Sequence, residues 1–327
     1  MSIRALVTGA SGFIGGAVAR RLVERGANVR VLLRAGTRAN VPDPGAVEPA
    51  IGDLRDAGAV LAAARSCDAV FHAGGLYSFY ASADELHAIN VGGTRNVVDA
   101  VRQTGARLVH TSSISTIGGM RDGKIPDEQQ DAGTAPGPYK ESKWLAERLV
   151  REECERGLDA VIVNPTFPVG WGDVKSTPTG ALIRDFLAGK IPAYVETGMN
   201  VVDIDDVAAG HWLAYERGRR GERYILGHEN LTMRELLEQL AELSGRKAPR
   251  VRLPYAVALG LAHADALVSG RRAKHARVPL EGVRTAKEIR FASSARAVRE
   301  LGLPQTPVRE ALATAVRWFE SPLQGVG

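Results

Sequence analysis

Short apolar runs alternate with helical patterns through the first half of the chain. The runs at 3–7, 29–33, 69–72, 108–111 and 160–163 have the length of buried strands, and apolar residues recur at helical spacing between them. Strands that alternate with helices are typical of a parallel sheet covered by helices on both faces. Because the crossovers are right-handed, the carboxyl ends of the strands lie along one edge, where ligands bind. The pattern therefore predicts an α/β fold with a doubly wound parallel sheet.

This alternation ends near Pro165. We expect residues 1–165 to form one domain and residues 166–327 to form mainly a second, smaller region. The segments 200–204 and 224–226 have the pattern of short strands, and we expect both to return to the main sheet. The two parts of the chain are therefore predicted to interleave rather than to follow one another as separate bodies.

The second region also contains helical patterns. These cover residues 181–188, 207–216, 232–243 and 308–319. Either Asp205 or Asp206 is expected to cap the second of these helices. Thr232 and Glu235 form a capping-box pattern at the start of the third. The last helix is interpreted as a packing element.

One further stretch, residues 254–268, is unusually apolar for a helix and is interrupted by His263 and Asp265. The favoured interpretation is a helix packed on the core. The alternative is a wall for an apolar ligand, or a contact with a membrane surface aided by Arg271 and Arg272. The sequence leaves both open.

Composition and charge indicate an ordinary soluble globular protein. Of the 327 residues, 45% are hydrophobic and 24% are charged, and the net charge of +5 is spread along the chain. The isoelectric point of about 9.3 therefore gives no argument for nucleic-acid binding. Arg-rich stretches such as 217–220 and 271–274 are interpreted as solvated surface.

The cysteines and the apolar runs bear on location. Cys67 and Cys154 have neither paired nor metal-ligand spacing, which indicates a reducing compartment and no metal site. The chain enters its first strand at once, which leaves no room for a signal peptide. None of its apolar runs is long enough to span a membrane. We therefore expect a cytoplasmic protein with no integral membrane segment.

The junction between the first strand and the first helix carries the clearest chemistry. Glycines at 9, 12 and 15 let the backbone approach a phosphate, and the helix N-terminus offers unpaired N–H groups and a positive dipole end. A glycine triplet alone also fits an ordinary turn, but this one sits where the mechanism requires it. We predict a Rossmann-type dinucleotide site formed by Thr8, Gly9, Ser11, Gly12, Phe13, Ile14 and Gly15.

The end of the second strand bears on the choice of dinucleotide. An acidic residue there usually holds the ribose hydroxyls of NAD. No carboxylate lies between Glu24 and Asp43, and Arg34 stands at the strand end. A guanidinium favours the 2′-phosphate of NADP, so NADP is the preferred cofactor and NAD the alternative. Arg34 can also be an ordinary surface residue.

Further cofactor contacts are predicted where other strands end. Asp53 and Leu54 follow the third strand, where Asp53 either contacts the adenine or caps the next helix. Ala73 and Pro165 follow the strands at 69–72 and 160–163 and complete the predicted set.

Tyr139 and Lys143 are the candidate catalytic pair. They lie four residues apart in a helical pattern and so share one helix face. A nearby ammonium lowers the pKa of a phenol by stabilising the phenolate, which makes Tyr139 a usable general acid or base. Lys143 would also reach the nicotinamide ribose. This spacing occurs by chance in many helices, and the upstream glycine motif makes it specific.

Two hydroxyls at the end of the strand 108–111 are candidates for a second hydrogen bond to the substrate oxygen. Ser113 is preferred and Ser112 is the alternative, although a serine here can also be a turn residue. Asn90, a polar residue in the helical pattern 85–101, either bridges the backbone near the site or is exposed.

Together these motifs resemble the extended short-chain dehydrogenase/reductase family, in its NAD-dependent epimerase/dehydratase branch. The matching elements are 8–15, 52–54, Asn90, Ser113 and 139–143. The second half is similar to hopanoid-associated sugar epimerases, which are themselves similar to dihydroflavonol 4-reductases. The stretches that carry this similarity are 163–170, 172–180 and 221–227. With them the resemblance covers nearly the whole chain.

One position departs from that pattern. Asp203 stands where these relatives usually have His. The departure affects the expected substrate pocket and leaves the groups for hydride transfer in place.

The resemblance implies an NAD(P)-dependent enzyme with Ser113, Tyr139 and Lys143 as its active site. A hydride moves between the nicotinamide and a secondary alcohol or carbonyl, while Tyr139 exchanges the proton. Dehydration of sugars is not expected, because Ile114 and Ser115 stand where dehydratases carry Asp-Glu. Two outcomes remain open. The family resemblance favours an epimerase that recycles its cofactor, and Arg34 favours a reductase that consumes NADPH.

The resemblance also bears on partners. It implies a small-molecule substrate (a sugar, a sugar nucleotide or a hopanoid-linked carbonyl) bound by residues 166–327, and a homodimer formed through the helix that carries Tyr139. A non-catalytic dinucleotide sensor is the remote alternative. Such sensors usually lack the Tyr/Lys pair, which this chain has.

Overall fold

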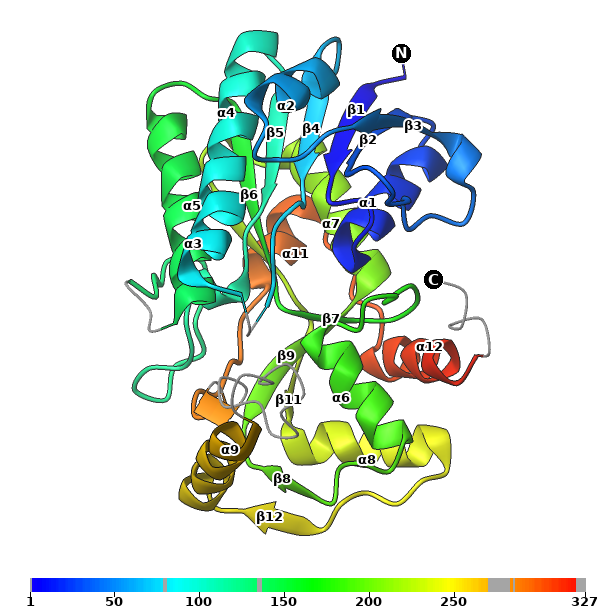
Figure 1. Cartoon of the computed structure of the whole chain (residues 1–327), viewed down its shortest axis with the longest axis vertical. Helices are drawn as coiled ribbons and strands as arrows, with labels where there is room; N and C mark the ends of the chain where they lie inside the picture. Colours follow the sequence, from blue (N-terminus) through cyan, green and yellow to red (C-terminus); the bar gives the residue numbers. More distant parts are fainter. Residues whose placement is uncertain (1, 79–80, 134–136, 270–282, 285, 322–327) are drawn as a thin grey trace.

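The computed structural model describes residues 2–78, 81–133, 137–269, 283–284 and 286–321. Among them, seven parallel strands form a central sheet in the order β10-β6-β5-β4-β1-β2-β3 (Figure 1). Their bounds are β10 Arg223–Leu226, β6 Ala160–Pro165, β5 Arg107–Thr111, β4 Ala69–His72, β1 Arg4–Thr8, β2 Asn28–Leu33 and β3 Val47–Ile51. The order reverses between β1 and β4, which is where doubly wound sheets bind dinucleotides. The predicted fold class is confirmed.

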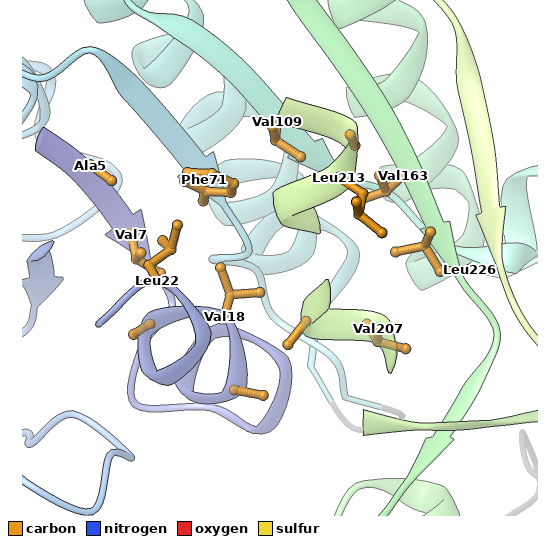
Figure 2. Packing of buried hydrophobic residues seen from close by; sticks show 14 of the residues in the cluster. Ala5, Val7, Val18, Leu22, Phe71, Val109, Val163, Val207, Leu213 and Leu226 are labelled. Atoms are coloured by element: carbon orange, nitrogen blue, oxygen red, sulfur yellow. The ribbon is translucent and has the colours of Figure 1, made fainter. Parts of the chain in front are cut away.

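Strand side chains alternate between the two faces of this sheet, and helices cover both. Val7 and Phe71 lie in one apolar core with α1 (Phe13–Glu24) and α7 (Ile204–Arg217). Figure 2 shows this core, where side chains of α1 and α7 gather against those of the strands. Leu6 lies in the opposite core, against helices α2 Ala57–Ala64, α4 Gly93–Thr104 and α5 Pro138–Glu155. Each fully buried Leu, Val or Phe contributes about 1.5–3 kcal/mol to the free energy of unfolding.

The second region has its own small sheets and its own core. β7 (Phe167–Val169) and β11 (Glu229–Thr232) flank β9 (Gly198–Asp203), and β8 (Ala193–Val195) pairs with β12 (Val251–Leu253). In Figure 1 these elements lie below the main sheet. The helices here are α6 Pro178–Leu187, α8 Met233–Ser244, α9 Tyr255–Ser269 and α12 Val308–Glu320. The apolar faces of α6, α8 and α12 form a separate core around β7 and β9.

One of the two predicted returns to the main sheet is wrong. Residues 224–226 do return, because β10 pairs in parallel with β6 at the sheet edge. The segment 200–204 does not. Its strand β9 pairs in parallel with β7 and antiparallel with β11, so both of its edges are occupied in the second sheet.

Of the two predicted helix N-caps, the one of α8 is confirmed and the one of α7 is wrong. Thr232 and Glu235 form the predicted capping box of α8. α7 begins one turn earlier than expected, and Asp203, not Asp205 or Asp206, is its N-cap. Asp206 instead accepts hydrogen bonds from the backbone N–H and hydroxyl of Thr306. The residue that departs from the family pattern is thus the cap of a helix that packs on the main sheet.

The apolar helix predicted at 254–268 is present as α9. Ala258 and Ala262 are buried, whereas Val257 and Leu261 are exposed. One face therefore packs on the protein and another does not. Arg271 and Arg272 lie outside the described residues. Short helical elements complete the chain: η1 Pro44–Ala46, α3 Ala83–Leu86, η2 His87–Gly92, η3 Ile114–Thr116 and α11 Ala295–Leu301.

Candidate active site

The glycine motif forms the turn between β1 and α1, at the carboxyl end of β1. Gly9 has φ of +78°, and a Cβ there would lie 2.7 Å from the backbone of Ala73. A Cβ at Gly15 would lie 2.3 Å from the carbonyl oxygen of Gly9. Only glycine fits these two positions, because any side chain would collide with backbone. The turn therefore packs directly against the chain that leaves β4.

The first turn of α1 fits the pyrophosphate of a dinucleotide. Its N-cap, Gly12, has no side chain, so no cap accepts the N–H groups of the first turn. In contrast, Thr177, Asp203 and Thr232 each accept an N–H at the start of α6, α7 and α8. Free N–H groups and the positive end of the helix dipole are what a phosphate requires. Phe13, at the start of α1, is buried and anchors this end of the helix.

At the adenosine end of the site, Arg34 and Asp53 lie close enough to interact. Arg34 is exposed just beyond β2. Asp53 forms a two-point ion pair with Arg55 at 2.9 Å, which lowers its pKa to about 2, and the charge of Arg34 contributes to the lowering. The alternative role of Asp53 as a helix cap is wrong, because Asp56 caps α2. The carboxylate of Asp53 is therefore already paired with Arg55.

The other predicted cofactor residues lie along the same edge at different distances from the glycine turn. Leu54 packs beside Gly74, just after β4, and Ala73 lies against Gly9. Pro165 ends β6, three strands from β1 in the sheet, where it pairs with Leu226 of β10. The structure thus brings Leu54 and Ala73 to the glycine turn and places Pro165 farther along the edge.

Tyr139 lies in the first turn of α5, and its phenol is close enough to Ser113, which follows β5, for the serine to lower the pKa of the phenol. Ser112 takes no part in this contact, since its hydroxyl donates to Glu147. Burial raises the pKa of Tyr139, and Ser113 only partly offsets this. Lys143 is not among the groups that shift this pKa, contrary to expectation, and its ammonium donates to the carbonyl of Thr111 at 2.8 Å. The phenol is therefore held in its protonated form.

Two residues that the sequence did not single out flank Tyr139. The ring of Tyr77 packs edge-on against it, with centroids 4.3 Å apart. Although 43% of Tyr77 is exposed, burial of its phenol raises its pKa to about 12. Arg290, from near the end of the chain, is close enough for its charge to oppose the raised pKa of both tyrosines. No local pattern marks either residue, because both reach the site through long-range packing.

Lys143 lies one turn after Tyr139 on α5. Burial lowers the pKa of Lys143 to about 8, and the charge of Glu147 opposes this shift. Glu147 lies one turn further along α5 and is itself buried. Its carboxylate accepts hydrogen bonds from Thr116 at 2.6 Å and Asn164 at 2.8 Å, and it pairs with buried Arg223 at 3.0 Å. This network fixes the position of the charge that faces Lys143. The i+4 spacing from Lys143 was a signal from which Glu147 could have been found.

Two buried histidines and Asn90 complete the surroundings. The rings of His72 and His110 lie 5.4 Å apart, and burial lowers the pKa of His72 to about 3. His72 bridges the hydroxyls of Thr8 and Thr94 as a neutral ring. Asn90 is buried and bridges to the backbone of Leu76, which settles the open alternative in favour of a structural bridge.

Comparison with known proteins places this geometry in a family. The model of the NAD dependent epimerase/dehydratase family matches residues 5–227. The chain belongs to that family. It is 40% identical over 323 residues to a putative dihydroflavonol 4-reductase of Synechocystis sp., covering 96% of this chain and 94% of the relative. It is 35% identical over 320 residues to sterol demethylase protein B of Methylococcus capsulatus, covering 96% and 97%.

Solved structures give the same assignment. A nucleoside-diphosphate-sugar epimerase from Pseudomonas aeruginosa superposes with a TM-score of 0.78 at 27% identity, covering 98% of each chain. The predicted resemblance to the extended short-chain family, in its epimerase/dehydratase branch, is therefore confirmed. As a member of the NAD dependent epimerase/dehydratase family, the protein is an oxidoreductase of the extended short-chain type that uses NAD(P).

Three further features concern the described part of this family member. In the described part of the chain, no group of three or more His, Cys, Asp or Glu side chains has the arrangement of a metal site. Cys67 and Cys154 are buried free thiols. Among the described helices, none combines the length and the apolar character needed to cross a bilayer.

Proposed function

We propose that this family member is an NADP-dependent carbonyl reductase for an uncharged, ring-bearing substrate, with Ser113, Tyr139 and Lys143 as its catalytic residues. The contact between Tyr139 and Ser113 carries the proposal. Both hydroxyls lie beyond the carboxyl end of β5, on the edge that also holds the glycine turn. Because burial keeps Tyr139 protonated, it is suited to donate a proton, which is what reduction of a carbonyl requires.

The mechanism follows from these side chains. A bound nicotinamide supplies the hydride that reaches the carbonyl carbon. Tyr139 donates its hydroxyl proton to the carbonyl oxygen as negative charge develops there, and Ser113 donates a second hydrogen bond to that oxygen. Lys143 would hold a positive charge toward the ribose of a bound nicotinamide, and Tyr77 covers the phenol of Tyr139 and keeps water away from it.

An uncharged substrate is supported by the charges beside Tyr139. Lys140 pairs with Glu288 at 2.8 Å, and Arg290 contacts the same carboxylate at 3.5 Å. Both cations are thus already engaged by Glu288, and the diphosphate of a sugar nucleotide would have to compete with that carboxylate for them. The names of the two relatives, dihydroflavonol 4-reductase and sterol demethylase, both refer to ring-bearing compounds. A hopanoid-linked carbonyl belongs to the same chemical class.

The second candidate is an epimerase that keeps and recycles its cofactor. The structural similarity to a nucleoside-diphosphate-sugar epimerase favours it. Arg34 argues for the reductase, because an exposed guanidinium at the end of β2 suits the 2′-phosphate of NADP and a reductase draws on NADPH.

Transfer of deuterium distinguishes the two candidates. The protein would be incubated with NADPH deuterated at C4 and a polycyclic ketone, and separately with NADP or NAD and UDP-galactose, and Tyr139→Phe would give the background. We expect deuterium in the alcohol and one NADP released for each alcohol formed from the ketone. Inversion of UDP-galactose without net reduction of the oxidised cofactor would contradict the reductase and support the epimerase.

Cofactor preference is tested separately by calorimetric titration with NADPH, NADP, NADH and NAD. We expect the phosphorylated pair to bind more tightly and Arg34→Ala to remove the difference. Equal or tighter binding of NAD would overturn the role given to Arg34 and favour the self-recycling epimerase.

A further inference from the structure

A loop from the second half of the chain lies against the glycine turn. This Lys175 loop, residues 170–177, connects β7 to α6. Asn40 holds it in place, because its side-chain amide donates to the carbonyl of Gly172 at 2.7 Å and its backbone N–H donates to Ala10 in the glycine turn. At the tip of the loop, the ammonium of Lys175 lies 3.2 Å from the hydroxyl of Ser11. Residues 164 positions apart thus meet at the cofactor edge.

The Lys175 loop has a fixed shape. Asp173 is buried and accepts hydrogen bonds from the backbone N–H and the hydroxyl of Thr177 at 2.9 and 2.7 Å. Ser176, directly after Lys175, has φ of +48°, a left-handed conformation that costs a non-glycine residue energy. The surrounding contacts stabilise this conformation, so Lys175 lies at the tip of a turn whose backbone is fixed.

The positive charges of Arg34 and Lys175 favour binding of an anion beside the Lys175 loop. Arg34 is near enough for its positive charge to lower the pKa of Lys175, in addition to the effect of burial. In the described part of the chain, neither Arg34 nor Lys175 forms an ion pair with a carboxylate, and Asp53 is held by Arg55. Two cations close enough to influence each other repel, and a phosphate dianion relieves that repulsion.

We propose that Lys175 and Arg34 together bind the 2′-phosphate of NADP, with the hydroxyl of Ser11 as a further donor. This inference rests on the proposed preference for NADP and deepens it. Arg34 lies just beyond β2, on the adenosine side of the glycine turn, and Lys175 approaches from the second region. The second region therefore contributes to cofactor choice as well as to substrate binding. The sequence pattern did not indicate this, because nothing local links position 175 to the turn.

Binding of cofactor fragments tests the proposal without any turnover. 2′,5′-ADP and 5′-AMP differ only in the 2′-phosphate, and calorimetry would measure both against the wild type, Lys175→Gln, Arg34→Gln and the exposed-surface control Lys190→Gln. We expect Lys175→Gln to weaken 2′,5′-ADP about ten- to a hundredfold, as expected for a charged hydrogen bond, and to leave 5′-AMP unchanged. Lys190→Gln should change neither, and Lys175→Arg should restore most of the affinity.

The outcomes separate this inference from the proposed function. If Arg34→Gln removes the preference for 2′,5′-ADP but Lys175→Gln does not, the NADP preference stands and the role of Lys175 is overturned. If Lys175→Gln weakens both fragments equally, the lysine contacts the 5′-phosphate and the proposal is overturned. If the wild type binds both fragments equally, the NADP preference and the Lys175 site are overturned together.

Discussion

The two ends of the proposed site, a phosphate end and a catalytic end, are built in different ways. The phosphate end comes from residues 8–15, a single turn whose shape follows from glycines that are neighbours in the sequence. The catalytic end is assembled from segments that lie far apart: Tyr77 after β4, Ser113 after β5, Tyr139 on α5 and Arg290 near the end of the chain. The phosphate end is therefore specified by backbone conformation. The catalytic end is specified by packing and charge, which only the folded chain brings together.

Removing the hydroxyl of Tyr139 should have the largest effect at the catalytic end. We expect Tyr139→Phe to lower kcat about 10²- to 10⁴-fold while NADP binding stays unchanged, because the proton donor is lost and the phosphate end is intact. Steady-state kinetics and calorimetry measure the two effects. Tyr77→Phe is the matched control, with an expected loss below about tenfold. Equal losses in the two variants would mean that Tyr139 is not the proton donor.

This division explains what the sequence could and could not predict. The parallel sheet, the glycine turn and the Tyr139 helix follow from local periodicity and spacing. The return of 200–204 to the main sheet was wrong, because strand pairing depends on which edges are free, and the pattern of one strand does not report that. The pKa of Tyr139 was expected to fall and instead rises, because burial depends on residues such as Tyr77 that no spacing rule connects to it.

Glu147 tests whether buried charge controls the catalytic end. Glu147→Gln keeps the shape of the side chain but removes the negative charge that holds up the pKa of Lys143. We expect that pKa to fall below about 8, so that Lys143 loses its proton at lower pH and the alkaline fall of kcat/KM moves to lower pH. Arg223 loses its buried partner, which should cost about 3–5 kcal/mol in the free energy of unfolding.

A second variant separates charge from stability. Arg223→Met also breaks the buried ion pair, but it leaves the carboxylate of Glu147 facing Lys143. We expect it to lower the free energy of unfolding in urea without moving the alkaline limb to lower pH. If both variants shift the limb in the same direction, the shift reflects loosened packing and Glu147 has no electrostatic role.

The phosphate end is tested by a pair of glycines that share a backbone conformation. Gly9 and Gly26 have φ of +78° and +76°, but only at Gly9 would a Cβ collide with the backbone of Ala73, while the space at Gly26 is open. We expect Gly9→Ala to weaken NADP binding about ten- to a hundredfold, in line with overpacking of 1–3 kcal/mol. Gly26→Ala should leave binding unchanged and show only the strain of a left-handed alanine, about 1 kcal/mol in thermal unfolding. A similar loss of binding in both would show that backbone strain, not close approach, limits the turn.

The smallest expected effect concerns Asp203, which lies in neither end of the site but at the start of α7. Burial raises its pKa to about 6, and the neighbouring Asp205 and Asp206 add to the shift. Since the folded state holds this proton more tightly than the unfolded chain, the free energy of unfolding falls as the pH rises from about 4 to 6.

Asn caps a helix as well as Asp does and carries no charge. Asp203→Asn should therefore match the wild type near pH 4 and exceed its free energy of unfolding at pH 7 by about 1–2 kcal/mol. Urea unfolding at the two pH values measures this, with Asp56→Asn as the control at an exposed cap. A loss of stability at pH 7 would mean that the charge of Asp203 favours α7 through the helix dipole more than burial opposes it.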